Sequence, residues 1–311
     1  MAASNLTATT IVAVPTWRRP ERLRHLLDAL SRIEGLGDVA LLVAENDAAE
    51  RAGERVAKAA AAAGYPMPID VIVVAQSGLA HVRNAIVARA LEHESMRRLA
   101  MIDDDEWPEP QWLVELLRVQ RETGAAVVGG PVIPSFAEGS PKWADQTLVF
   151  RPEERPEGVA DMLYASNNLL VTREALQTLE RPWFDPSFNR SGGEDLDFLT
   201  RLKARGRTFA WAPAARVQEW VGPERARRSW VLRRMWRIGV TDTMVARKRR
   251  GRALLSLRSL ALLALRTLAL PSLLWNGRRL DVAGQWVKAV ARLYALMGGS
   301  EAIYAAPAAK S

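Results

Sequence analysis

Short apolar runs alternate with helix-like segments over the first 130 residues. Between the runs, leucines recur at helical spacing, as in the segment that opens at Pro20 and places Leu23, Leu26, Leu27 and Leu30 on one face. The runs themselves lack alternating polar positions, so each predicts a strand that is buried on both faces. They span residues 11–14, 39–43, 69–74, 99–102 and 125–128. The pattern predicts an α/β fold, a Rossmann-like, mostly parallel sheet with helices on both faces.

Beyond residue 130 the pattern is less regular. Residues 131–158 are rich in Pro, Gly, Glu and Ser and predict an irregular connection. Later strands are expected at 169–171, 209–211 and 217–221, and helices at 173–179, 194–205 and 225–250. We therefore expect a disordered tip at 1–10, one domain at 11–222 with halves at 11–130 and 131–222, and a basic, amphipathic helical extension at 223–311.

The segment 253–275 is a special case because it holds eleven leucines but also Arg258, Arg266 and Pro271. Each arginine costs about 2.5–3.5 kcal/mol in the centre of a membrane-spanning helix, so the two arginines together cost close to what the eleven leucines return. An amphipathic segment lying in the membrane interface fits this balance better. A helical hairpin buried in a soluble domain and a spanning helix are the alternatives.

Composition and charge restrict the class of protein. The chain has 311 residues, 49% apolar and 25% charged, which is ordinary for a globular protein, and the lack of cysteine excludes disulfides and thiolate metal sites. No basic residue precedes Arg18 and the first apolar run is short, so we expect a cytoplasmic protein without a signal peptide.

The charge is concentrated in one tract. Residues 222–258 hold twelve Lys or Arg against two acids, a local charge of about +10. Such a tract suits phosphate-bearing partners, namely nucleic acid, anionic lipid or a diphosphate. No nucleic-acid-binding motif accompanies it, so we expect no nucleic-acid partner. A solvated helical face is the structural alternative.

Candidate chemistry begins at the acid loop, which we define as Asp103, Asp104, Asp105 and Glu106. Clustered carboxylates repel one another unless a cation, a proton or a ligand relieves the repulsion. The loop follows the strand expected at 99–102, and ligands bind at this edge of open α/β sheets. The pattern favours Mg²⁺ or Mn²⁺ shared with a diphosphate, whereas a solvated turn is the alternative.

Two further acidic positions follow the same logic. Glu45 and Asp47 end the second predicted strand, and Glu194-Asp195 follow Gly192-Gly193 at the start of a predicted helix. The glycines permit close approach of a substrate, and an ionised Asp195 is a candidate general base. Helix capping is the alternative explanation of the second pair.

Six segments together resemble glycosyltransferase family 2, in the order of that family. They are Val12-Ala-Val-Pro-Thr-Trp-Arg-Arg-Pro-Glu-Arg-Leu23, Ala44-Glu-Asn-Asp47, Gly78-Leu-Ala-His-Val-Arg-Asn84, Ile102-Asp-Asp-Asp105, Ser166-Asn-Asn-Leu-Leu-Val171 and Gly192-Gly-Glu-Asp-Leu-Asp-Phe198. The resemblance covers about residues 10–250 and is strongest to bacterial exopolysaccharide transferases that extend lipid-linked oligosaccharides.

The resemblance implies a GT-A fold and an inverting glycosyltransferase that uses Mn²⁺ or Mg²⁺. It implies a nucleotide-diphosphate sugar, with UDP as the expected nucleotide, bound by residues 11–130, and a lipid-linked or saccharide acceptor bound by residues 131–222. Asp195 would be the base and Glu194 would lie beside it. The nucleotide-sugar residues would be Pro15, Thr16, Arg18, Glu45, Asp47, Arg83, Asp103 and Asp104. The metal ligands would be Asp103, Asp105 and Glu219, and the acceptor-side residues Asn167, Asn168 and Trp183.

This chain departs from the family at two positions. Glu45 stands where Asp is more usual, and Glu219 stands where many relatives have a metal-binding histidine; Glu219 is either a ligand or a surface strand residue. Region 223–275 is expected to contact an anionic membrane surface, which would make the protein peripheral on the cytoplasmic face of the inner membrane.

Two other classes of protein compete with the transferase. A sugar-phosphate nucleotidyltransferase needs a Gly-rich loop after the first strand, and residues 15–19 contain no glycine. A non-catalytic adaptor that binds membranes or polyanions through the basic tract would ignore manganese and nucleotide diphosphates.

Overall fold

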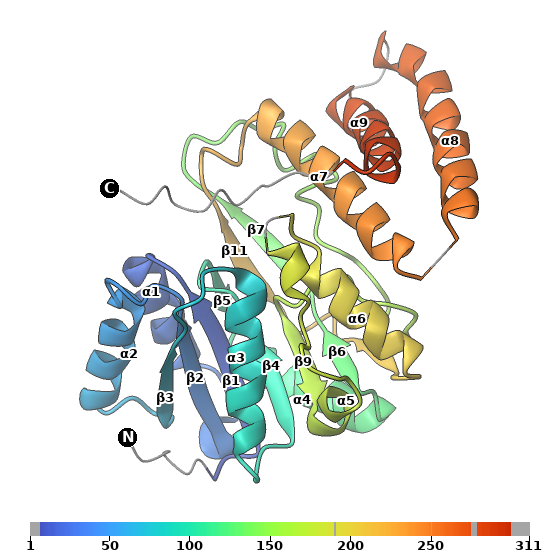
Figure 1. The fold of residues 1–311 in the computed structure, drawn as a ribbon. Helices are drawn as coiled ribbons and strands as arrows, with labels where there is room; N and C mark the ends of the chain where they lie inside the picture. Colours follow the sequence, from blue (N-terminus) through green and yellow to red (C-terminus); the bar gives the residue numbers. More distant parts are fainter. Residues whose placement is uncertain (1–6, 190, 250, 275–278, 300–311) are drawn as a thin grey trace. The chain divides into compact units, whose positions relative to one another are not determined.

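The computed structural model describes residues 7–189, 191–249, 251–274 and 279–299 (Figure 1). The chain divides into two compact units. The sheet unit comprises Met1–Ile133, Pro152–Asn189 and Asp197–Glu219, and the helical unit comprises Pro134–Arg151, Arg190–Leu196 and Trp220–Ser311. These units do not follow the boundary expected at residue 222, because residues 134–151 belong with the C-terminal helices.

The main sheet has eight strands in the order β3-β2-β1-β4-β9-β6-β10-β8. Their bounds are β1 Thr10–Thr16, β2 Val39–Glu45, β3 Ile69–Val73, β4 Arg98–Met101, β6 Val127–Gly129, β8 Gly158–Ala160, β9 Leu169–Thr172 and β10 Phe209–Trp211. A second sheet has the order β5-β11-β7, formed by β5 Glu106–Pro108, β7 Val132–Phe136 and β11 Val217–Val221.

The helices connect these strands and then continue beyond them. Their bounds are α1 Pro20–Leu30, α2 Ala52–Ala62, α3 Leu79–Glu92, α4 Trp112–Thr123, α5 Arg173–Gln177, α6 Glu194–Ala204, α7 Arg228–Arg247, α8 Arg252–Leu268 and α9 Arg279–Leu296. Single 3₁₀ turns lie at Leu36–Asp38, Pro186–Phe188 and Leu270–Leu274. None of the helices within the described residues combines the length and the apolar character needed to cross a bilayer.

The expected α/β class and the mostly parallel sheet are confirmed. Successive residues of β1 point to opposite faces: Ile11 packs with helices α3, α5 and α6 on one side, and Val12 packs with α1, α2 and α4 on the other. Both faces are therefore covered, which explains why the strands lack polar alternation. Of the expected disordered tip, residues 1–6 lie outside the described residues, while Thr9 bonds Asp38 and Thr10 begins β1.

Strand β9 determines which segment lies next to the acid loop, at the edge of the sheet where β1, β2 and β4 end. Strands β1, β2 and β4 are parallel, so they end at the same edge. Strand β9 lies antiparallel between β4 and β6, and its first residue, Leu169, pairs with Met101, the last residue of β4. Residues just before β9 therefore emerge where the acid loop begins.

Candidate active site

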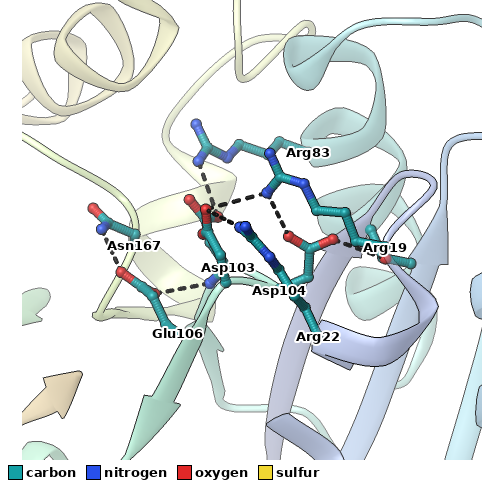
Figure 2. Close-up of polar contacts among 9 residues, drawn as sticks. Arg19, Arg22, Arg83, Asp103, Asp104, Glu106 and Asn167 are labelled. Atoms are coloured by element: carbon teal, nitrogen blue, oxygen red, sulfur yellow. Dashed lines mark hydrogen bonds and ion pairs between the residues drawn. The ribbon is translucent and has the colours of Figure 1, made fainter. Parts of the chain in front are cut away.

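The acid loop lies at this edge and is held by Arg19, which lies between β1 and α1, and by Arg22 in the first turn of α1 (Figure 2). Asp104 accepts hydrogen bonds from the Thr16 hydroxyl at 2.9 Å and from Arg19 Nη1 at 3.0 Å. Asp104 is buried, and burial raises the pKa of its carboxyl although the charge of Arg19 opposes the rise. Asp104 thus joins the loop to the end of β1.

The two aspartates on either side of Asp104 have different surroundings. The Oδ2 atom of Asp105 lies 3.2 Å from Arg19 Nη1 and 3.4 Å from Arg22 Nη1, and the residue is buried. The side chain of Asp103 is 31% exposed, and its Oδ1 lies 3.4 Å from Nη2 of Arg83. Asp103 and Asp105 are thus each paired with arginines of the site, Asp103 with Arg83 and Asp105 with Arg19 and Arg22.

Arg83 is one of the most deeply buried cations among the described residues, with 3% of its surface exposed. It sits on α3, and its guanidinium carbon lies 5.8 Å from the ring centroid of Phe184. Figure 2 shows its guanidinium directed at Asp103. A buried cation at this edge of the sheet is suited to an anionic ligand such as a diphosphate.

Glu106 links the acid loop to the segment before β9. Its Oε2 accepts the backbone N–H of Asp103 at 2.9 Å, and its Oε1 accepts the side-chain amide of Asn167 at 2.5 Å (Figure 2). Pairing of β5 with β11 places Glu219 opposite it. Burial, followed by the negative charge of Asp103, raises the pKa of Glu106 well above its ordinary value. Burial and the nearby negative charge therefore favour the neutral form of the Glu106 carboxyl, which links the acid loop to Asn167.

Glu45, one of the predicted nucleotide-sugar residues, lies at the end of β2. Glu45 is fully buried, and its carboxylate accepts the backbone N–H groups of Asp47 at 2.7 Å and Gly53 at 2.5 Å. A side chain at Gly53 would place its Cβ 2.8 Å from Glu45 Oε2 and 2.5 Å from Thr16 Cγ2. Glu45 therefore holds the first turn of α2 against the sheet.

Asp47 and Arg18 form an ion pair at the same edge, with Arg18 Nε 2.5 Å from Asp47 Oδ2. The hydrogen bond from Arg18 lowers the pKa of Asp47. Arg18 is exposed, whereas Pro15 and Thr16 are buried. Of the expected nucleotide residues at the ends of β1 and β2, Arg18 is therefore the most exposed.

The three predicted acceptor-side residues, Asn167, Asn168 and Trp183, differ in burial. Asn168 is buried and uses its whole amide: Oδ1 accepts from Trp112 Nε1, and Nδ2 donates to the carbonyls of Pro131 and Ala215. Trp183 is buried in the core and donates its indole N–H to the Leu176 carbonyl. Both residues are structural. Asn167 is partly exposed and bonds Glu106, so it remains a candidate.

Glu194 and Asp195 begin α6, as the sequence predicted for a helix at this point. Gly192 and Gly193 precede them with φ of +74° and +103°, a conformation that other residues adopt only with strain. Glu194 is buried and Asp195 is partly exposed. The helical unit contributes these two residues, and α6 enters the sheet unit at Asp197.

The predicted metal ligands are Asp103, Asp105 and Glu219. Within the described residues, no three Asp, Glu or His side chains converge as a group that could hold a metal ion. Asp105 is directed toward Arg19 and Arg22, and Glu219 lies opposite the buried Glu106. The donor chemistry still fits Mg²⁺ or Mn²⁺, because these ions bind through one or two carboxylates and take their other ligands from phosphates and water.

Sequence reasoning missed Arg19 and Arg22 as parts of this site, and it placed Glu106 in the acid loop without its partner Asn167. The signal for the arginines was present, because Arg18, Arg19 and Arg22 follow the end of β1, next to the strand that carries the acids. Opposite charges at adjacent strand ends indicate an ion-pair network. The contact of Glu106 with Asn167 gave no such signal, because the two residues lie 61 positions apart in the sequence.

Comparisons with known proteins place the chain in a class. Residues 8–241 match the family described as "Glycosyltransferase like family 2". The succinoglycan biosynthesis protein ExoM of Rhizobium meliloti (strain 1021) is 34% identical over 251 residues, which cover 77% of this chain and 76% of ExoM.

Two solved structures share the fold at low identity. The Pyrobaculum calidifontis mannosyltransferase PcManGT, in complex with GDP-Man and Mn²⁺, has a TM-score of 0.62 at 15% identity, covering 93% of this chain and 87% of that one. S. aureus TarS 1-349, in complex with UDP, has a TM-score of 0.53 at 12% identity, covering 94% and 92%.

These findings and the fold define the protein as a glycosyltransferase. The chain belongs to glycosyltransferase-like family 2.

Proposed function

We propose that the protein transfers a sugar, with inversion, from a nucleotide-diphosphate sugar to a hydroxyl of a lipid-linked or saccharide precursor of an exopolysaccharide. The acid loop carries this proposal, because Asp103 and Asp105 present oxygen ligands beside Arg83, Arg19 and Arg22 at the edge of the sheet. The named role of ExoM in succinoglycan biosynthesis supports an exopolysaccharide product.

Each group at the edge has a chemical task in this proposal. Asp103 and Asp105 would hold Mn²⁺ or Mg²⁺, which neutralises the leaving diphosphate when bound. Arg83 would add a fixed positive charge near the same diphosphate. The bound Mn²⁺ and GDP-Man of PcManGT and the bound UDP of TarS support this type of donor, and we take UDP as the first nucleotide to test.

The acceptor hydroxyl must lose a proton as it attacks the anomeric carbon. Asp195 is the proposed base, because its carboxylate is partly exposed at the first turn of α6. Glu194 would lie beside it to contact the acceptor or the sugar. A single displacement by that hydroxyl inverts the configuration of the sugar.

The location follows from the proposed acceptor. A lipid-linked acceptor and the basic tract at 222–258 together support a peripheral position on the cytoplasmic face of the inner membrane. The basic tract is the observation that favours a non-catalytic adaptor, and a membrane-bound transferase explains it equally well.

A sugar-nucleotide assay tests the proposal. The purified chain is supplied with UDP- and GDP-sugars, lipid-linked oligosaccharide acceptors, and Mn²⁺, Mg²⁺ or chelator. We expect turnover with one donor class, and loss of about 10²- to 10⁴-fold in Asp195→Asn with donor binding retained. Asp161→Asn makes the same change at an acid that is 94% exposed and serves as the matched control. Full turnover of Asp195→Asn would remove the assigned base.

A further inference from the structure

Helix α8 presents leucines to solvent instead of to the protein. The exposed leucines on this helix are Leu254, Leu257, Leu260, Leu265 and Leu268, the last with 80% of its surface exposed. Leu255 and Ser259 are buried on the opposite side, where α8 packs along α9. A surface helix of a soluble protein places its apolar face inward and its polar face outward. Helix α8 therefore has an outer face that is unusually apolar.

The leucines form one continuous stripe. At 100° per residue, Leu254, Leu257, Leu265 and Leu268 fall within an arc of about 80°, and Ala261 lies between them on the same side. The stripe extends about 21 Å along the helix at 1.5 Å per residue. That length is shorter than the hydrocarbon core of a bilayer, about 30 Å. The geometry suits a helix that lies in the plane of a membrane surface.

The charged residues around the leucine stripe indicate which kind of membrane surface it would bind. No acid occurs between Asp242 and Asp281, and this stretch contains nine basic residues: Arg247, Lys248, Arg249, Arg250, Arg252, Arg258, Arg266, Arg278 and Arg279. Arg258 is exposed and lies at the border of the stripe, about 40° from Leu254. Basic residues beside an inserted apolar face are attracted to anionic lipid headgroups.

The same charge argues against a second copy of the chain as the occupant. Two α8 helices packed face to face would bring the arginines of one copy near those of the other, and the helix offers no carboxylate to pair with them. An anionic bilayer supplies the negative charge that such a dimer lacks.

We propose that α8 is an interfacial anchor, which lies flat on an anionic leaflet with Leu254, Leu257, Leu265 and Leu268 inserted among the acyl chains and Arg258 at the headgroups. The purpose of the anchor, bringing the enzyme to a lipid-linked acceptor, rests on the proposed function. Membrane binding itself is measured without any sugar transfer.

Vesicle flotation of the full chain tests the anchor. We compare vesicles of phosphatidylcholine alone with vesicles that also contain about 30% phosphatidylglycerol, at low and at high salt. Phosphatidylglycerol gives the vesicle surface a negative potential. We expect binding to the anionic vesicles that weakens with salt, and a loss of at least tenfold in Leu257→Ser/Leu268→Ser. Val159→Ser, at an apolar residue of the sheet unit that is 80% exposed, should bind like the wild type.

Further measurements separate the outcomes. An unchanged melting temperature and unchanged donor hydrolysis in solution would show that the leucine variant is folded and that only docking is lost. The anchor is overturned if wild-type protein does not float with anionic vesicles, if it binds neutral vesicles equally, or if the leucine variant binds like the wild type. It is also overturned if that variant instead converts a dimer to a monomer. If vesicle binding holds while no donor is turned over, the proposed function fails and the anchor stands.

Discussion

The indole N–H of Trp112 donates a hydrogen bond to Oδ1 of Asn168 over 2.7 Å, at a place where neither side chain reaches solvent. Trp112 begins α4, and Asn168 precedes β9 with a positive φ of 59°. The amide of Asn168 also donates to Pro131 and Ala215, so one side chain joins four parts of the sheet unit. The neighbouring Asn167 bonds the acid loop instead.

Asn168→Ala should lower the free energy of unfolding by about 3 kcal/mol or more. The substitution leaves the buried Trp112 N–H and the Ala215 carbonyl without this partner, and each such group costs about 1–3 kcal/mol, whereas the Pro131 carbonyl keeps the backbone N–H of Val217. Asn168→Asp should be at least as damaging, because an oxygen would then face the two carbonyls. Urea denaturation monitored by tryptophan fluorescence measures both. A loss below about 0.5 kcal/mol for either variant would show that the amide is not a structural clamp.

Glu106 should make stability depend on pH. Its pKa is raised in the folded protein by burial and by nearby negative charge, so the folded state retains a proton that the unfolded state releases. The stabilisation is fully present below the unfolded value of about 4.3 and is lost as the pH rises toward the folded pKa. The loss is at most about 1.4 kcal/mol per pH unit.

Glu106→Gln removes this titration while keeping the shape of the side chain. In chelator, the difference in unfolding free energy between this variant and the wild type should shift in favour of the variant as the pH rises from about 5 to about 8, a range chosen to lie above the unfolded pKa. A difference that stays constant across this range would mean that Glu106 has an ordinary pKa.

Arg19 and Asp104 should be energetically coupled, by about 1 kcal/mol. Arg19 is 42% exposed, so solvent screening reduces the value of the pair below that of a fully buried one. A double-mutant cycle with Arg19→Gln and Asp104→Asn measures the coupling from urea midpoints. Effects that add to within about 0.3 kcal/mol would show that Arg19 does not stabilise the buried carboxylate.

Much of the fold could be predicted because apolar periodicity carries local information. The strand at β1 and the leucine face of α1 follow directly from their residues, and the structure begins and ends both within two residues of the prediction. The pairing of strands that are distant in the sequence could not be predicted from apolar periodicity. The insertion of β9 between β4 and β6 depends on side-chain packing across the sheet, and so does the pairing of β5 with β11.

The positions of the acidic residues in the candidate site could be predicted from the sequence. The residues that contact them could be predicted less well. Strand ends located Asp103 and Asp105 at the ligand edge, because that edge follows from parallel topology. Asn168 and Trp183 share residue types with ligand-binding side chains, and only their burial shows that they are structural. The same holds for Glu45, because a glutamate that caps α2 and a glutamate that binds a ligand look alike in the sequence.

The most direct test of the central claim is calorimetric titration of UDP and GDP into the protein, with Mn²⁺ and with chelator. We predict that one nucleotide binds at least tenfold more tightly with Mn²⁺, and that Asp103→Asn/Asp105→Asn removes this enhancement while Asp161→Asn keeps it. Equal affinity in chelator, or an undiminished manganese effect in the double variant, would contradict the assignment of the acid loop to a metal-bound diphosphate.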